Sequence, residues 1–355
     1  EISCSLVGSE MCIRDRNIIV GLFSMLVVVI FGIGYSYADD VYNYESVIST
    51  SDWSNMNHAE RVEKLSIPNE YIQNMTTTEL LNSVLAYPYF SDMLFYDNMQ
   101  EGFYAVKEHF NGLQELLARA DRGEVLLSEY KVLTAMHTAR TLNNADYFKL
   151  LFLETILAQP EMASISAEQQ NEISTLVDQN YQLELEAPNF FSESAYYEIL
   201  ANQQGIDLQS YSSYVTTPRG SKVSVTISSS SDSDAALASN AYFVDYIHTY
   251  YPGASIVAAA SDWYNCHGFA WAQSTFVWMN DPSAYWNDGS YSLKAQGQPT
   301  AVGQKVTYGG TTHSGIVIGL SGNCIRSKWG RMNLVDHSVT NCPYYYAPVI
   351  VSYYN

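Results

Sequence analysis

Apolar side chains recur every three to four positions through the first half of the chain, which is the spacing of amphipathic helices. Thr76 and Glu79 have the spacing of a capping box at the start of one such stretch, and Pro68 and Pro88 mark two helix ends. The expected helices cover residues 56–65, 75–85, 102–120, 126–142, 146–157 and 166–183. We therefore predict an α-helical domain over residues 45–203.

The pattern changes after this region. Turn residues at 217–220 precede Lys222-Val-Ser-Val-Thr-Ile227, whose period of two predicts a short strand. Residues 228–234 contain four serines followed by Asp-Ser-Asp, a composition typical of a flexible linker. Residues 204–239 are thus expected to be a strand and a Ser-rich linker, with a helix over residues 235–251 leading into the C-terminal region.

Strands and turns alternate near the end of the chain. We expect strands at residues 304–308, 313–319 and 324–329, separated by Gly309-Gly310 and by Ser321-Gly-Asn323. An apolar helical stretch precedes them. A helix packed on a small antiparallel sheet is an α+β arrangement, and we assign it to residues 240–355.

Two segments of this region contain candidate catalytic residues. Asn265 is a plausible helix N-cap, with Cys266 in the first turn of an apolar helix expected to extend to Trp278. Unpaired amides and the helix dipole favour a thiolate at such a position. His313 stands at the entrance of a β-branched strand, so a thiol and an imidazole would meet where helix and sheet pack.

These segments carry a resemblance to a known family. The strings Tyr264-Asn-Cys-His-Gly-Phe-Ala-Trp271, Gln304-Lys-Val-Thr-Tyr308 and His313-Ser-Gly-Ile-Val-Ile-Gly319 are similar to NlpC-type and CHAP-type cell-wall hydrolases, which have a reduced papain-like fold. The resemblance covers residues 240–355. It implies Cys266 as nucleophile and His313 as general base. The sequence departs from the family at His267, where a small residue is usual.

The family also places an orienting residue on the strand after the base. Here that strand offers Arg326-Ser-Lys328, none of which is a good acceptor for an imidazole N–H. His337, with Asp336 behind it, is the best replacement, although a surface turn accounts for this pair equally well. His267 is expected to be structural, because it points away from its neighbour on a helix.

Other chemistries lack the spacing that they need. Cysteine and histidine occur at 266, 267, 324, 337 and 342, but no CxxC or HxxxH pair anchors a zinc site. The chain has no G-x-S-x-G elbow, phosphate loop or dinucleotide fingerprint. His58, His109 and His137 are isolated. We expect no metal and no cofactor.

The cysteines leave two alternatives open. Cys4 and Cys12 precede the expected mature chain, and Cys266, Cys324 and Cys342 remain. A bridge between Cys324 and Cys342 would leave Cys266 free to react. All three could equally be reduced and partly buried.

Residues 1–38 are not expected to belong to the folded domains. Residues 1–16 fit no structural pattern and are similar to translated sequencing-adapter read-through, so we interpret them as a non-native leader. Residues 17–38 have the apolar core of a secretory signal, with Arg14 and Arg16 before it and Ser36-Tyr-Ala38 as a cleavage site. We expect cleavage after Ala38 and export to the cell envelope or medium. An uncleaved membrane anchor is the alternative.

Charge narrows the range of partners. The chain carries 37 Asp and Glu against 17 Lys and Arg, a net charge of −20, which disfavours nucleic acid. The resemblance and the signal segment together imply a secreted cysteine hydrolase that cleaves an amide bond in cell-wall peptide or another extracellular peptide. The alternatives are an inactive surface or binding protein that recognises glycan or protein, and an acyl transferase that uses the same thioester. The sequence does not indicate an oligomeric state.

Overall fold

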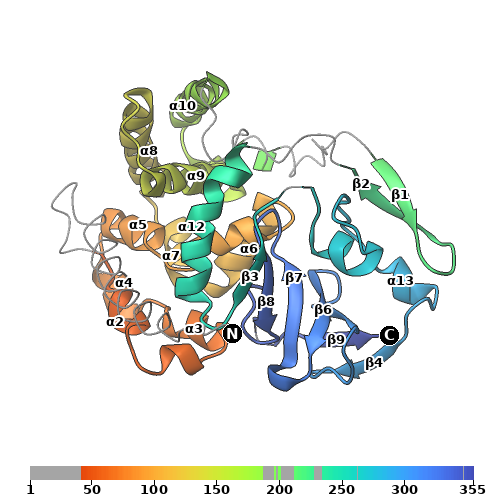
Figure 1. Ribbon diagram of the computed structural model, residues 1–355. Helices are drawn as coiled ribbons and strands as arrows, with labels where there is room; N and C mark the ends of the chain where they lie inside the picture. The colour runs from red at the N-terminus through yellow and green to blue at the C-terminus, as the bar shows by residue number, and fades with distance from the viewer. Residues whose placement is uncertain are drawn as a thin grey trace, which may run out of the picture. The chain divides into compact units, whose positions relative to one another are not determined.

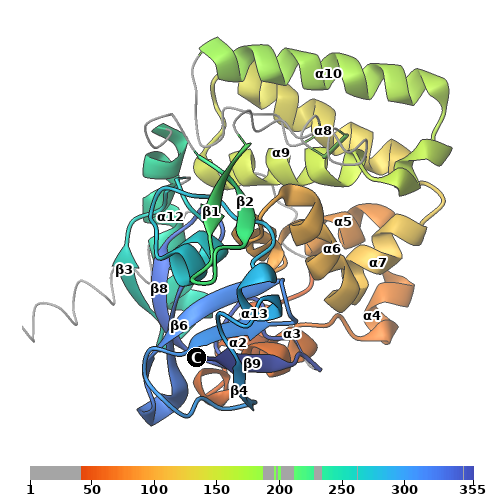
Figure 2. The same ribbon diagram turned by 90° about the vertical axis from the view of Figure 1, so that its right-hand side faces the viewer.

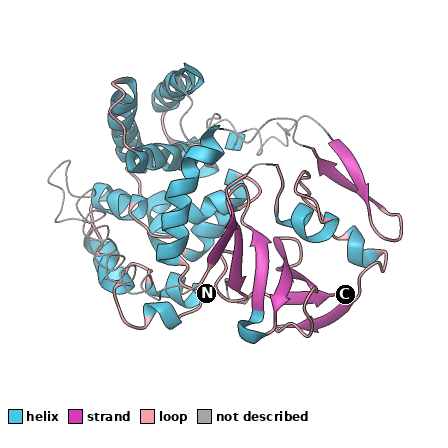
Figure 3. Cartoon of the chain, viewed as in Figure 1, coloured by secondary structure: helices cyan, strands magenta, loops and turns pink. Residues whose placement is uncertain are grey.

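Helices make up the first part of the described chain and strands most of the last part, as the computed structural model shows (Figure 1, Figure 3). The structure describes residues 41–186, 196, 199–200, 212–227, 234–261, 263–346 and 348–355. The expected leader (1–16), the signal segment (17–38) and nearly all of the Ser-rich linker lie outside the described residues. The predicted α+β class is confirmed.

The helical part begins close to the expected position. Its elements are α2 (Glu45–Ile48), η1 (Trp53–Asn55), α3 (His58–Lys64), α4 (Asn69–Asn74), α5 (Thr77–Leu85), η2 (Phe90–Phe95), α6 (Met99–His109), α7 (Asn111–Ala118), α8 (Arg122–Thr138), α9 (Asn144–Leu157), η3 (Pro160–Ser164) and α10 (Ala167–Glu186). The capping box at Thr76 and Glu79 is confirmed, with both reciprocal hydrogen bonds present.

One expected helix is two helices. The apolar spacing predicts a continuous helix over residues 102–120, but Phe110 is extended (φ −116°, ψ 106°) between α6 and α7. Its buried ring stacks on Tyr87, with centroids 3.8 Å apart and planes 7° apart. Packing of this aromatic side chain therefore breaks a pattern that helical periodicity alone would continue.

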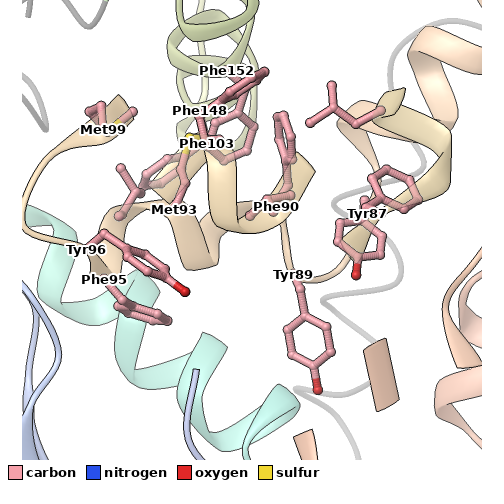
Figure 4. Close-up of a cluster of buried hydrophobic side chains, with 14 of the residues drawn as sticks. Tyr87, Tyr89, Phe90, Met93, Phe95, Tyr96, Met99, Phe103, Phe148 and Phe152 are labelled. Atoms are coloured by element: carbon pink, nitrogen blue, oxygen red, sulfur yellow. The ribbon is translucent and has the colours of Figure 1, made fainter. Parts of the chain in front are cut away.

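Aromatic side chains fill the space between these helices. Figure 4 shows η2 and α6 surrounded by buried rings, including Phe90 against Phe152. Gly102 allows α6 to lie close to η2, since a Cβ at this position would lie 2.0 Å from the Met93 carbonyl oxygen. Farther along the chain, α8 packs against both α9 and α10 (Figure 2).

The strands form a hairpin and a larger sheet. The hairpin pairs β1 (Ser212–Thr216) with β2 (Lys222–Thr226). The sheet has the order β3-β8-β7-β6-β5-β9-β4, and every neighbouring pair is antiparallel. Its strands are β3 (Ser255–Ala258), β4 (Leu293–Gln296), β5 (Lys305–Tyr308), β6 (His313–Gly319), β7 (Cys324–Lys328), β8 (Leu334–Ser338) and β9 (Val351–Tyr354).

The strands expected at β2, β5, β6 and β7 are confirmed, and so are the two turns between the last three. Gly309, Gly310 and Gly322 all have positive φ, as tight turns require. Residues 334–338 form a strand, β8, so the surface-turn interpretation of that segment is wrong. The sequence did not predict β1, β3, β4, β8 or β9.

The helix α12 (Asp234–Tyr250) comes after the linker in sequence but packs on the helical part. Tyr242 stacks on Phe148 with ring centroids 4.2 Å apart, and the Tyr246 hydroxyl donates to Asp92 at 2.7 Å. Residues 42–355 form one compact unit, and a single cluster of buried side chains extends from Tyr44 to Tyr353. Among the described helices, none has the length and apolarity needed to cross a bilayer.

Candidate active site

Asn265 caps the turn that carries Cys266, as predicted. Its Oδ1 accepts from the amides of Gly268 at 3.0 Å and Met279 at 3.1 Å, and its Nδ2 donates to the Met279 carbonyl at 2.7 Å. One buried side chain thus joins the start of the helix to the segment that returns after it. This fixes the backbone at Cys266 from two directions.

The helix itself is much shorter than predicted. It ends in the π-helical turn η4 (Gly268–Ala272), and Gln273 is left-handed (φ 52°). A Cβ at Gly268 would lie 2.0 Å from the Val277 carbonyl oxygen, so the chain folds back tightly over the turn. The expectation of a helix to Trp278 is wrong, because Trp278 instead bridges to Thr226 of β2.

The Cys266 thiol is buried, with 2 % of the residue exposed. Burial and then the Asp97 carboxylate raise its pKa well above that of an ordinary thiol. The backbone amides of Ser314, His267 and Cys266 itself lower the pKa in part. Burial outweighs them, so Cys266 is predominantly a thiol at neutral pH.

His313 begins β6, as predicted, and is fully buried. Its ring stacks on Tyr344, with centroids 3.7 Å apart and planes 10° apart. Burial, then the nearby His337 and His267, lowers its pKa well below that of a free imidazole. His313 is therefore neutral at pH 7.

The two faces of β6 have different surroundings. The Ser314 hydroxyl binds His267 Nδ1 and accepts from Trp271 Nε1, both at 2.8 Å. Successive side chains of a strand point to opposite faces, so His313 points away from this contact. It lies instead beside Tyr308, its register partner on β5.

The predicted Cys266 and His313 segments thus meet through the residues that follow each of them, His267 and Ser314. The backbone amide of Ser314 also lowers the pKa of the Cys266 thiol. Neither ring nitrogen of His313 has a hydrogen-bond partner among the described residues, so no thiol–imidazole hydrogen bond is formed in this conformation. The catalytic pairing remains a prediction.

His337, the predicted orienting residue, lies near His313 but is bound elsewhere. Its Nδ1 is 2.9 Å from the Ser338 carbonyl oxygen and its Nε2 is 2.7 Å from the Ser327 hydroxyl. Asp336 does not lie behind it: strand alternation puts Asp336 on the other face, where it pairs with Arg326 at 2.7 and 2.8 Å. The expected Asp336–His337 arrangement is therefore wrong.

His267 has the structural contacts expected of it. Besides Ser314, it binds the Thr311 carbonyl oxygen at 2.9 Å, and burial lowers its pKa to about 4. The imidazole thereby holds the loop before β6 against the turn of Cys266. The three described cysteines, Cys266, Cys324 and Cys342, are all free, so the bridge between the last two is not formed.

Sequence reasoning missed the roles of two residues in this region. Asp97 lies in the helical part, yet its carboxylate accepts from Asn265 Nδ2 at 3.1 Å and influences Cys266. Burial and the Glu101 carboxylate raise the pKa of Asp97 to about 7. The sulfur of Cys342 is not in a bridge but lies close to the rings of His313 and His337. No local signal indicates either role, because both residues approach the site through tertiary contacts.

Comparison with known proteins identifies no relative: no family model, no curated protein and no solved structure matches the chain.

Proposed function

We propose that the protein is a cysteine hydrolase of papain-like arrangement that cleaves an amide bond through Cys266. The observation that supports this best is the Asn265 cap, which holds Cys266 in the first turn of a helix. Free amides at a helix start stabilise a thiolate, and donors of the same kind stabilise the oxyanion of an acyl intermediate.

In this proposal His313 takes the proton of the Cys266 thiol, and the thiolate attacks the carbonyl carbon of the substrate. The C–N bond breaks as the resulting imidazolium gives that proton to the leaving amine. The imidazole then takes a proton from the water molecule that cleaves the thioester and returns it to the Cys266 sulfur. His313 would have to leave its stack on Tyr344 and turn towards the sulfur. The unpartnered ring nitrogens lower the cost of that movement, since no hydrogen bond is broken.

The substrate class is inferred from the resemblance and from the signal segment. A chain exported behind residues 17–38 would meet cell-wall peptide or another extracellular peptide. Its net charge of −20 agrees with a partner other than nucleic acid. Purification of the exported protein with Asp39 as its first residue would support the route, whereas an intact apolar segment in the membrane fraction would indicate an anchor.

A binding protein with the same arrangement is the second candidate. It is favoured by the burial of Cys266 and by the rise in its pKa, since both oppose nucleophilic attack. In that case the Cys266 turn would serve packing alone, and aromatic surface residues such as Phe276, which is 58 % exposed, would contact the partner.

The decisive experiment is the rate of iodoacetamide alkylation of Cys266 across pH 4 to 9, with each cysteine mapped by mass spectrometry. The hydrolase predicts a reactive Cys266 whose midpoint rises in His313→Gln, together with release of new amines from wall peptides that is lost in Cys266→Ser. Cys324→Ser is the matched control and should change neither result. If Cys266 is unreactive and its pH profile does not depend on His313, the binding protein is the remaining candidate.

A further inference from the structure

Three potential metal ligands lie close together on the face of the sheet to which His313 points. His313 begins β6, His337 lies on β8, and Cys342 comes after β8 and a short turn. Their ligand atoms all lie within 4.8 Å of one another, and no more than 1 % of any of the three residues is exposed. Three segments of sequence thus bring two imidazoles and a thiol to one enclosed point.

The ring nitrogens of His313 lack hydrogen-bond partners at this position among the described residues. Both nitrogens are buried. A buried polar atom left unpaired is destabilising, because it has lost its hydrogen bonds to water. Such an atom in a native structure calls for a missing water, ion or other group. A bound cation beside His313 would satisfy the nitrogen that faces His337 and Cys342.

The donor set selects the class of cation. Two imidazoles and one thiolate suit Zn²⁺ and its close substitutes, whereas Mg²⁺ and Ca²⁺ prefer oxygen ligands. Three protein ligands leave a fourth position for water or another group. Burial keeps His337 neutral by lowering its pKa to about 4, and a neutral imidazole is the form that binds metal.

The surroundings of His337 match those of a metal ligand. Its Nδ1 lies 2.9 Å from the Ser338 carbonyl oxygen, and this contact fixes the ring and leaves Nε2 as the ligand atom. Nε2 now contacts the Ser327 hydroxyl at 2.7 Å and would exchange that contact for the ion. The Trp329 indole, which donates to Ser327 at 3.1 Å, holds the hydroxyl in place.

We propose that His313, His337 and Cys342 form a buried binding site for Zn²⁺ or a similar divalent transition-metal ion. Binding forms one metal–sulfur bond and releases the Cys342 thiol proton to solvent, with no change in oxidation state. If the proposed hydrolase is correct, the bound form is also latent, because a His313 held by the ion cannot serve Cys266. The site itself does not depend on that activity.

Titration of the metal-free full chain with Co²⁺ tests the site directly. We expect a saturable thiolate-to-cobalt charge-transfer band at one equivalent, which Zn²⁺ abolishes. Cys342→Ser should remove the band and His337→Gln should weaken binding about tenfold or more. Cys266→Ser and Cys324→Ser are matched controls that should retain it. A band that disappears with Cys266 or Cys324, or no saturable band at all, overturns the proposal.

A second measurement covers the case in which the buried variants fail to fold. X-ray absorption of the zinc-loaded wild-type protein should show one sulfur at about 2.3 Å and nitrogen neighbours at about 2.0–2.1 Å. A shell of nitrogen and oxygen alone would exclude Cys342. Alkylation of Cys266 in the same metal-free protein reports on the hydrolase separately, so either proposal can fail without the other.

Discussion

The side-chain amide of Asn265 donates to the Asp97 carboxylate at 3.1 Å and so ties the turn before Cys266 to the loop before α6. This contact spans 168 positions of sequence. It places a carboxyl group whose pKa is raised to about 7 beside the buried thiol. Ionisation of Asp97 therefore disfavours ionisation of Cys266 above neutral pH.

Replacing Asp97 should make Cys266 more acidic. In Asp97→Asn the amide oxygen still accepts from Asn265, but the negative charge that raises the thiol pKa is gone. We expect the alkylation midpoint of Cys266 to move to lower pH, with the largest rate increase above pH 7. Asp245→Asn, an exposed charge on α12, should leave the profile unchanged. An alkylation midpoint that is unchanged or higher in Asp97→Asn would contradict the coupling between Asp97 and Cys266.

Asp92 should make stability depend on pH. Burial raises its pKa to about 8 even though Tyr251 and Tyr246 donate to it at 2.6 and 2.7 Å. The folded state therefore binds a proton that the unfolded state, with an ordinary pKa of 3.8, has lost. The stabilisation of the folded state by this bound proton is complete below pH 4 and is lost as pH rises through 8.

The Asp92→Asn variant isolates this contribution. We expect the unfolding free energy of the wild type, minus that of the variant, to fall between pH 5 and 7.5 with a slope approaching about 1.4 kcal/mol per pH unit. Urea denaturation at several pH values measures it. Taking the difference removes the opposing contribution of the buried histidines that do not contact Asp92, since both proteins share it; His58, whose Nε2 lies 3.7 Å from the Asp92 carboxylate, is the exception. A difference independent of pH would show that Asp92 is ionised in the folded state.

Arg61 should be a major contributor to stability. Its buried guanidinium donates to the Trp53 carbonyl at 3.0 Å and to the Asn341 Oδ1 at 2.8 Å, and so joins α3 to the segment that carries Cys342. Arg61→Ala leaves Asn341 Oδ1 without this donor and the Trp53 carbonyl with the Met56 amide alone, and we expect a loss of roughly 3 kcal/mol by urea denaturation. Lys64→Ala, an exposed position on the same helix, should change stability by less than about 0.5 kcal/mol. Equal effects at both positions would refute this role.

Two glycines of β6 provide a matched pair. A Cβ at Gly315 would lie 2.6 Å from Ile325 Cγ2 and 2.9 Å from the Arg326 carbonyl oxygen, whereas at Gly319 the nearest atom is 3.5 Å away. Gly315→Ala should therefore destabilise the protein by roughly 1–3 kcal/mol, and Gly319→Ala by much less. Thermal unfolding of the two variants compares them directly. Similar melting temperatures would mean that β6 and β7 do not approach this closely.

The sequence determined the local elements of this protein and much of their order. Periodicity located α5, α9, α10 and α12, and turn chemistry located the strands β5 to β7, because both signals depend on neighbours within a few residues. The cap at Asn265 and the strand start at His313 were predictable for the same reason. The α+β class could be inferred from these elements.

The surroundings of the candidate residues depend on contacts between segments that are distant in sequence. Phe110 breaks a helix because its ring fits against Tyr87, and the Cys266 helix stops early because Val277 folds back over Gly268. Asp97 reaches Cys266, and Cys342 reaches His313, through packing of distant segments. Hydrophobic burial is non-directional, so the sequence states which side chains are apolar but not which of them meet. The partners of a buried thiol or imidazole are therefore fixed by the assembled core.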